Sequence, residues 1–475
     1  MRDDRLRSMS SRPASRRRLL QGAGASAFLA AATPFFRTGA GAATLRQTPT
    51  TRNIEGTNLS ILLWSHFVPR HDEWFDQFVA EWGEANGVTT MVDHVNTADV
   101  PAAIAAEIGA GQGHDIVEHI ASLAQYEKSV LDLTDLIDEA TARHGEQLPM
   151  ARRNSFNPTT GKFYGFCHGY APDPGNYRRS LWEATGMETG PDSWETLLTG
   201  GTAIKADQGV QMGLGMSNEI DSRMAAQSLL WAYGAAVQDE NENVAINSPE
   251  TVAAVEYMAQ LYGQAMTPEV FGWNAASNNQ LLVAGRASYI LNSISAYRTA
   301  QRDQPETGAD IFFTRPIVGP AGEAAALAHG HAVFVSMIPN YAQYPDTAKE
   351  FLLHLVDNYA AACEQSELYN FPAWTETVPA LMGDDGWLAN DPFGSEPADK
   401  LAVLQTANDW TTNLGHPGPA NAAMGEIFAL PILPNMMARA AQGQQSAQDS
   451  VARAEQEINE IFAKWHGEGL IGGGA

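Results

Sequence analysis

The sequence predicts an α/β protein whose sheet is mostly parallel. Between residues 59 and 119, strand-like apolar runs alternate with segments of helical periodicity, in the order strand, helix, strand, helix, strand. Consecutive parallel strands need long crossover connections, which are usually helices, so this alternation is typical of a parallel sheet. The chain has 475 residues, enough for two or more domains with sizeable cores.

The elements of this first region follow from their side-chain periods. The helical segment from Asp72 to about Asn86 repeats large apolar residues at helical spacing, and we expect Gly83 and Gly87 to terminate it. Because these apolar residues share one helical face, they are better explained as core than as ligand contacts. The five predicted elements are Leu59–Trp64, Asp72–Asn86, Thr89–His94, Val100–Ile108 and Asp115–His119.

Further along, turn and cap signals mark the elements. A Pro-x-x-Gly pattern at 158–161 predicts a β-hairpin over 157–165. After Pro191 we expect a helix capped by Asp192 or Ser193, and a second helix begins at Ser248, which precedes a proline. Residues 446–465 form an amphipathic pattern, which predicts a helix docked on the second domain.

The first 43 residues are typical of an export signal. Ser15 is followed by Arg16, Arg17 and Arg18, then by an apolar Gly/Ala-rich run and a small-residue exit that ends at Ala42. The alternative, a membrane anchor, needs about 20 apolar residues, and the run here is shorter. We therefore expect a twin-arginine signal peptide cleaved near Ala42, a flexible leader over 44–56, and a protein located in the periplasm.

The charge of the chain is strongly acidic. Removing residues 1–43 changes the balance from 29 basic and 55 acidic residues to 21 and 53, a net charge of −32. Such a surface repels nucleic acid and anionic lipid, and it favours neutral or cationic ligands. Adaptation to a salty habitat explains the same charge equally well. Two cysteines, Cys167 and Cys363, make no disulfide framework, and we expect two buried free thiols, although a single bridge is possible in an oxidising compartment.

Five short motifs occur in order along the chain: Gly161–Phe166, Tyr177–Gly186, Pro191–Leu197, Phe271–Tyr289, and Pro316–Gly319 followed by Gly330. Read together, they resemble the family 1 extracellular solute-binding proteins of ABC importers, the group that contains maltose-binding protein. The resemblance extends from about Leu59 to Phe462, and each motif is weak alone. Arg178 and the run His329-Gly330-His331 depart from the family pattern.

This resemblance implies a two-lobed periplasmic binding protein fold of type II, with a ligand cleft between hinged lobes. It places lobe one at residues 57–168 plus 271–328, and lobe two at 169–270 plus 329–470. Ligands of open α/β sheets bind beyond the carboxyl ends of the strands, so the loops after Trp64, after Val117 and around Tyr170 should face the cleft.

A sugar site needs aromatic faces and in-plane polar groups, and several side chains near strand ends supply them. Trp64, His66 and Phe67 end the first strand, although Trp64 has the alternative of a packed core. For Trp374 the sequence leaves two alternatives, contact with the ligand and packing within a loop. By the resemblance, Glu118, His119 and Ser122 stand where relatives place binding groups, Tyr170, Asp173 and Trp273 lie where the chain crosses between the lobes, and Asn292 and Ser293 follow a strand ending at Leu291.

Histidine patterns that suggest metal sites do not have the required spacing. His114 and His119 would point to opposite faces of a strand, so one ion cannot bind both. His329 and His331 share a strand face but lack a third ligand nearby, and we prefer hydrogen bonds to ligand hydroxyls. The chain contains no nucleotide-binding glycine fingerprint, phosphate loop or cysteine cluster. We therefore expect neither metal nor cofactor.

Together these observations predict a non-enzymatic receptor. We expect a monomeric binding protein that captures a mono- or oligosaccharide, or a polyol, and delivers it to the permease subunits of an ABC transporter. A receptor for a cationic solute such as a polyamine is an alternative, supported by the acidity alone. A secreted glycoside-active enzyme is another, and it would need two carboxylates about 5–10 Å apart; Glu118 and Asp173 are the available pair.

Overall fold

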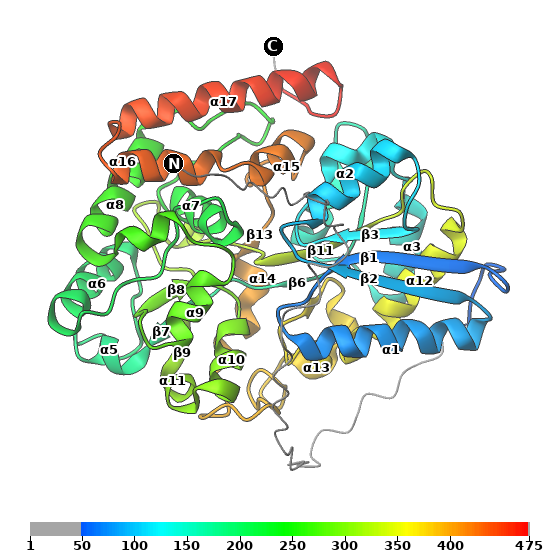
Figure 1. Cartoon of the computed structure of the whole chain (residues 1–475), viewed down its shortest axis with the longest axis horizontal. Coiled ribbons are helices and arrows are strands. Elements are labelled where there is room, and N and C mark those ends of the chain that lie inside the picture. The colour runs from blue at the N-terminus through cyan, green and yellow to red at the C-terminus, as the bar shows by residue number, and fades with distance from the viewer. Residues whose placement is uncertain (1–48, 474–475) are drawn as a thin grey trace, which may run out of the picture. The chain divides into compact units, whose positions relative to one another are not determined.

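A computed structural model describes residues 49–473 of the chain. The predicted signal peptide, residues 1–43, lies outside the described residues. Residues 49–473 form an α/β protein whose two largest sheets have six and three strands (Figure 1). The α/β fold class predicted from the sequence is confirmed.

The larger sheet begins with three parallel strands and continues with antiparallel ones. Strand β1 pairs in parallel with both β2 and β3, as the sequence predicts. Strand β11 is antiparallel to both β3 and β6, and β12 is antiparallel to β6, so this half of the sheet departs from the expected parallel arrangement. The strand order is β12-β6-β11-β3-β1-β2, with bounds Phe371–Pro372, Phe166–Ala171, Ala332–Met337, Ile116–His119, Asn58–Trp64 and Thr89–Val95.

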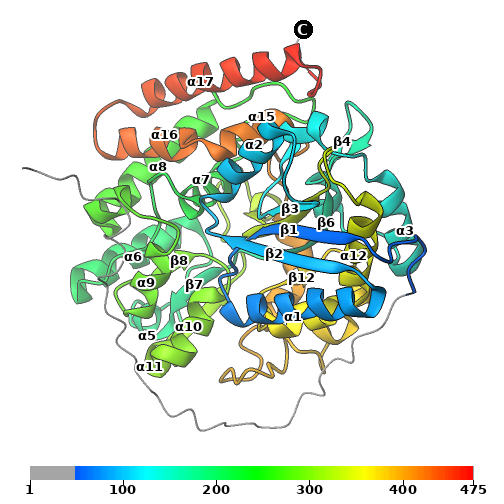
Figure 2. The ribbon, with the colours of Figure 1, turned by 45° about the vertical axis from the view of Figure 1, so that its right-hand side comes forward.

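Helices cover both faces of this sheet, and α1 and α2 lie on opposite sides of it in both views (Figures 1 and 2). Helix α1 buries Phe75, Phe78 and Trp82, which confirms that its aromatic face is core. It ends at Gly87, whose φ of 67° a glycine adopts without strain, whereas Gly83 lies inside the helix and does not terminate it. The helices of this region are α1 Pro69–Asn86, α2 Val100–Ala110, α3 Thr134–His144, α4 Pro149–Arg153, α12 Pro345–Asp357 and α13 Tyr359–Gln365.

The smaller sheet has the order β8-β7-β9 and is antiparallel, with bounds Tyr289–Leu291, Gly175–Arg178 and Ile311–Thr314. Ser193 caps α6 in a capping box with Thr196, and the Ser248 side chain accepts from Thr251 N at the start of α8, so both predicted starts are confirmed. Its helices are α5 Arg179–Glu183, α6 Trp194–Gln208, α7 Ile220–Ala232, α8 Pro249–Ala265, α9 Ser277–Val283, α10 Ser295–Asp303 and α11 Pro305–Asp310.

The last three helices pack onto this second region. Helix α17 contacts α8, α15 and α16, with Ser446 as its N-cap, which confirms the predicted C-terminal helix (Figure 1). The predicted hairpin is also present, as β4 paired with β5. The remaining bounds are β4 Phe156–Asn157, β5 Lys162–Phe163, β10 Ala328–His329, β13 Thr411–Thr412, α14 Ala407–Trp410, α15 Ala422–Ala429, α16 Ile432–Ala441 and α17 Ala447–Gly467.

The strand pairings divide the chain into lobes differently from the predicted boundaries. We call the six-stranded sheet with its helices the first lobe, and the three-stranded sheet with its helices and α15–α17 the second lobe. Strands β8 and β9, predicted in lobe one, pair with β7 in the second lobe. Strand β11, predicted in lobe two, lies in the middle of the first-lobe sheet. The predicted assignment is therefore wrong for residues 277–314, from α9 to β9, and for residues 332–372, from β11 to β12.

Part of the predicted flexible leader is held against the first lobe. The Arg52 guanidinium pairs with Glu139 at 3.0 Å and with Glu350 at 2.9 Å, and Glu350 also accepts from the backbone N–H groups of Thr51 and Arg52. Ile54 is 3% exposed. Buried carboxylates are stable where they gain several charged or N–H donors, so these contacts dock residues 51–54 and correct the expectation there.

Both cysteines are buried and free, which confirms that expectation for Cys167 and Cys363. Within residues 49–473, no helix is both long enough and apolar enough to cross a membrane.

Candidate functional site

A cleft of about 880 Å³ has walls from both lobes. The first lobe contributes the loops at the carboxyl ends of β1, β2 and β3, with the first turn of α2. The second lobe contributes the start of α7, the loop that leads into α9, and α15. Ligands of open α/β sheets bind at this edge, and ligand pockets usually enclose about 300–1,000 Å³. This cleft is therefore the candidate ligand site.

Four of the residues predicted from the sequence line the cleft, and the first lobe supplies three of them. Phe67 follows β1, His119 ends β3, and Ser122 follows that strand. Ser122 Oγ lies 2.7 Å from the Tyr164 hydroxyl and donates to Ala420 O, so its position is held by neighbours. Burial lowers the pKa of His119 to about 4, so its imidazole faces the cleft uncharged.

Trp273 lines the cleft from the second lobe, where its backbone carbonyl accepts a hydrogen bond from Ser217 Oγ at 2.8 Å. The chain does not cross between the lobes at this residue. It follows the short 3-10 helix Pro268–Phe271 and continues into α9 within the second lobe. Trp273 thus lines the cleft as predicted, although the prediction rested on a chain crossing that does not occur at this residue.

The start of α7 brings the cleft its two charged groups, Glu219 and Arg223. Glu219 is the N-cap of the helix: its carboxylate accepts from Asp221 N at 2.7 Å, from Ser222 N at 2.6 Å and from the Ser222 hydroxyl. The Arg223 side chain lies one turn further on and donates to Asn218 Oδ1 at 2.5 Å. Burial lowers the pKa of Arg223 from its usual value, while the charge of Glu219 acts in the opposite direction.

Glu118 and His119 show how strand alternation separates neighbours. Successive strand side chains point to opposite faces of a sheet, so Glu118 points away from the cleft. It accepts from His168 Nε2 at 2.7 Å and from Ser336 Oγ at 2.8 Å. Burial alone would raise the pKa of Glu118, but His168 and the other donors lower it below its usual value. The predicted role of Glu118 in the cleft is therefore wrong.

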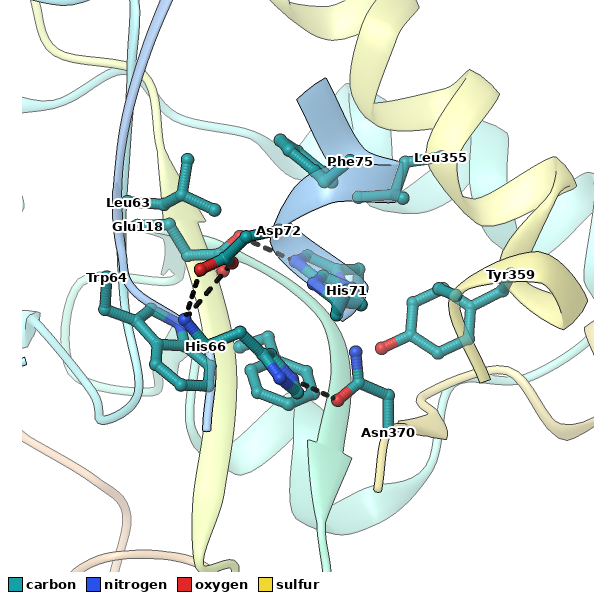
Figure 3. A pocket seen from close by; sticks show the side chains of 13 residues that line it. Leu63, Trp64, His66, His71, Asp72, Phe75, Glu118, Leu355, Tyr359 and Asn370 are labelled. Carbon is teal, nitrogen blue, oxygen red and sulfur yellow. Dashed lines mark hydrogen bonds and ion pairs between the residues drawn. The ribbon is translucent and has the colours of Figure 1, made fainter. Parts of the chain in front are cut away.

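Trp64 and His66 also lie in the first-lobe interior, around a cavity of about 20 Å³ (Figure 3). The Trp64 ring is 2% exposed and stacks on His66 and Phe334, with centroids 4.8 and 5.9 Å away. His66 Nε2 lies 2.9 Å from Asn370 Oδ1. This cavity has room for about one water molecule and none for a sugar. For Trp64 the packed-core alternative holds.

A buried group of four predicted or neighbouring side chains lies where the chain passes between the lobes. His331 Nδ1 is 3.2 Å from Asp173 Oδ1 and 4.0 Å from Asp221 Oδ1, and Asn292 Nδ2 donates to Asp221 Oδ2 at 3.2 Å. Burial raises the pKa of Asp221 well above its usual value, with the Glu219 and Asp173 charges acting in the same direction. Asp173 and His331 thus contact each other, Asn292 contacts Asp221, and none of the four lines the cleft.

The other predicted residues are buried without reaching the cleft. Trp374 is 0% exposed and packs on Phe166 at 5.3 Å between ring centroids, so the prediction that it forms an aromatic plate is wrong. Tyr170 donates to Asn408 Oδ1 at 2.5 Å, and Ser293 is 1% exposed. His329 stacks on Phe428 at 5.3 Å. His329 therefore packs against Phe428, which lines the cleft, without lining it itself.

Sequence reasoning missed most of the polar lining. Asn96 and Thr97 follow β2, and the rule that selected the loops after β1 and β3 also applies to them. The start of α7 does not follow a strand of the first-lobe sheet, so that rule does not select it. It reaches the cleft only because the second lobe lies opposite the first-lobe loops. The full lining is Ser65, Phe67, Asn96, Thr97, Ala98, Pro101, Ala102, His119, Ala121, Ser122, Leu123, Gln125, Asn218, Glu219, Ile220, Arg223, Trp273, Asn274, Ala275, Ala276, Asn279, Gly425, Phe428 and Ala429.

No cluster of three or more His, Cys, Asp or Glu side chains within residues 49–473 is arranged to hold a metal ion. His114, one of the suspected ligands, is bonded instead to Glu107 at 2.6 Å and to Asp93 at 3.1 Å.

Several solved structures of similar fold are proteins with a bound sugar or polyol. Maltose-bound T. maritima MalE3 has a TM-score of 0.69 at 17% identity, covering 86% of this chain and 100% of that one. An ABC transporter solute-binding protein from Thermotoga lettingae TMO, bound with α-D-tagatose, has a TM-score of 0.71 at 14% identity, with coverage of 86% and 100%. One from Agrobacterium radiobacter K84, in complex with ribitol, has a TM-score of 0.68 at 17% identity, with coverage of 86% and 100%.

The sequence itself matches a family model. A search of curated proteins finds no match. The model described as bacterial extracellular solute-binding protein matches residues 77–393, which is more than half of the chain and includes every strand of the first-lobe sheet except β1. Members of this family bind solutes and are not enzymes. The chain therefore belongs to the bacterial extracellular solute-binding proteins.

Proposed function

We propose that this protein captures a carbohydrate or polyol in the cleft between its lobes and delivers it to the permease subunits of an ABC transporter. The observation that carries the proposal is the lining of the cleft. Trp273 and Phe67 offer apolar faces, and Asn96, Asn274 and Asn279 offer amide groups. Sugars present apolar C–H faces and a rim of hydroxyls, which these two kinds of side chain bind. The maltose, tagatose and ribitol complexes of the similar structures support this ligand class.

The cleft offers little to the alternative ligands. Among the described residues that line it, Glu219 is the one carboxylate, and its oxygens already cap α7. A polyamine would need further carboxylates to replace its hydration. A glycosidase would need two, and both nominated residues, Glu118 and Asp173, lie away from the cleft. These observations favour a receptor for a hydroxyl-rich ligand.

A ligand that contacts both walls stabilises the closed form of the protein, since only that form makes all the contacts. We propose that Phe67 and His119 on one wall and Trp273 and Asn274 on the other make such contacts. Ligand binding then closes the lobes about the segments near Asp173 and His331, and the closed, monomeric protein is the form that docks on the permease.

We expect Trp273→Ala to lower affinity for the ligand about 5- to 150-fold, equivalent to about 1–3 kcal/mol, because it removes an apolar face. A thermal-shift screen of sugars and polyols identifies the ligand first, since a ligand at 100 times its Kd stabilises by about 2.7 kcal/mol. Calorimetry then compares wild type with Trp273→Ala. The control is Trp387→Ala, a half-buried tryptophan outside the cleft, which should keep full affinity. Stabilisation by no sugar or polyol, or equal affinity in all three proteins, would contradict the proposal.

We further propose that the protein reaches the periplasm by twin-arginine export, with cleavage near Ala42. Mass spectrometry of the exported protein should give an amino terminus close to Ala43. Replacing Arg16 and Arg17 together with lysine should leave the uncleaved precursor in the cytoplasm, because the arginine pair is what the export machinery reads. Normal export of that double variant would rule out this route.

A further inference from the structure

Arg223 is a cation in the cleft with unused hydrogen-bonding capacity. Its side chain is on the first turn of α7 and lines the cleft, and one terminal nitrogen donates to Asn218. Its Nε is buried and has no hydrogen-bond partner among the described residues. A buried polar group without a partner is unfavourable, and for a charged group the penalty is larger. A ligand atom is therefore the natural acceptor.

The nearest carboxylate does not satisfy this cation. Glu219 is four residues earlier, and its two oxygens accept from Asp221 N, Ser222 N and the Ser222 hydroxyl. Within residues 49–473, no carboxylate oxygen lies close enough to the Arg223 guanidinium, 4.0 Å or less, to form an ion pair. The contact of its guanidinium with the Phe428 ring, at 5.9 Å, neutralises no charge. Arg223 thus keeps its positive charge toward the cleft.

The rest of the lining makes this charge distinctive. The chain has a net charge of −26, yet the cleft presents one cation and one already engaged carboxylate. The other polar lining groups are amides and hydroxyls, together with His119, which burial keeps uncharged. Amides and hydroxyls match the rim of a sugar, while a guanidinium matches a carboxylate through two parallel N–H donors.

We propose that the ligand is a sugar acid, a carbohydrate bearing a carboxylate, and that Arg223 is the counter-ion of that carboxylate. This inference rests on the proposed function, that the cleft binds a hydroxyl-rich ligand. The carboxylate accepts from Arg223 Nε and from a terminal guanidinium nitrogen. The hydroxyls contact the asparagine side chains, and the sugar ring lies on Trp273. Arg223 therefore selects the acidic ligand over its neutral counterpart.

Matched ligand pairs test the inference by calorimetry: galacturonate against galactose, glucuronate against glucose, and the corresponding disaccharides. We expect wild type to bind the acid of at least one pair ten or more times tighter than the neutral sugar. Arg223→Gln should weaken binding of the acid about 10- to 150-fold, as expected for a charge-assisted hydrogen bond, and should bring the ratio of acid to neutral affinity close to one. Arg286→Gln, an exposed arginine outside the cleft, is the control and should change neither.

Each other outcome has a distinct meaning. Equal or tighter binding of the neutral sugars overturns this inference and leaves the proposed function standing. Binding of succinate, a dicarboxylate without hydroxyls, in place of any sugar acid or neutral sugar overturns both. Binding of no sugar, sugar acid or polyol also overturns both. If Arg223→Gln does not fold, the wild-type ratio of acid to neutral affinity decides alone, and Arg223→Lys, which keeps the charge, should retain part of the preference.

Discussion

Replacing Trp374 with alanine should lower the free energy of unfolding by about 3–5 kcal/mol. The Trp374 ring is 0% exposed and packs on Phe166 of β6, so the substitution leaves a cavity in the first lobe that the surroundings fill only in part. Urea denaturation measures the change. Protein that remains folded should bind the ligand as wild type does, because Trp374 does not line the cleft.

Two matched variants separate core from ligand contact at this position. Trp374→Phe keeps much of the ring and should cost less stability than Trp374→Ala. Trp273→Ala, in the cleft, should show the opposite pattern, with affinity lost and stability nearly kept. Loss of affinity in Trp374→Ala at unchanged stability would contradict this prediction, because it would show that the Trp374 ring contacts the ligand.

Lowering the pH from 7 to 5 should destabilise the protein by about 1.4 kcal/mol per pH unit, below about pH 6.5, for each histidine held neutral in the fold. Burial lowers the pKa of His66 to about 4, although the hydrogen bond to Asn370 acts in the opposite direction. Burial lowers the pKa of His329 and of His354 to about 4 as well. Between pH 4 and 6.5 the unfolded chain therefore binds more protons than the folded one, so stability falls as the pH falls.

Urea denaturation at pH 7, 6 and 5, at constant ionic strength, measures this effect. His66→Gln keeps a polar side chain but cannot take up a proton, so its stability should fall less steeply with pH than that of wild type. The difference in slope should be about 1.4 kcal/mol per unit below pH 6.5. Parallel curves for the two proteins would show that His66 is not neutral in the fold.

Local patterns were sufficient for the elements of the fold. The alternating segments from β1 to β3 needed only apolar periods of two and of about 3.6, and each lies where the sequence predicts it within a few residues. The caps at Ser193 and Ser248 are also local, since each side-chain oxygen reaches an N–H three residues ahead. The family resemblance rests on short motifs of the same kind, and it led to the right fold and class of protein.

The partners of each strand were not local. The residues of β11, 332–337, carry no signal that selects their partners. The strand pairs with β3 and β6, more than 160 residues earlier, although β8 and β9 are nearer in the sequence. A strand has the same apolar alternation whichever sheet it enters. The predicted lobe boundaries therefore failed for 277–314 and 332–372, although the strand ending at Leu291 was predicted correctly.

The candidate site divides in the same way. The sequence alone determined the α/β class, the elements from β1 to β3, the helices that begin near 193, 248 and 446, and the acidic charge. It also identified the loops after β1 and β3 that reach the cleft, because all of these depend on side-chain period, composition and the direction of parallel strands. Only the tertiary structure decided that Glu118 faces inward while His119 faces the cleft, and that Trp374 is core. It also decided that Arg223 of the second lobe lines the same cleft as His119. Those outcomes depend on which surfaces meet, and contacts between distant segments leave no trace in local spacing.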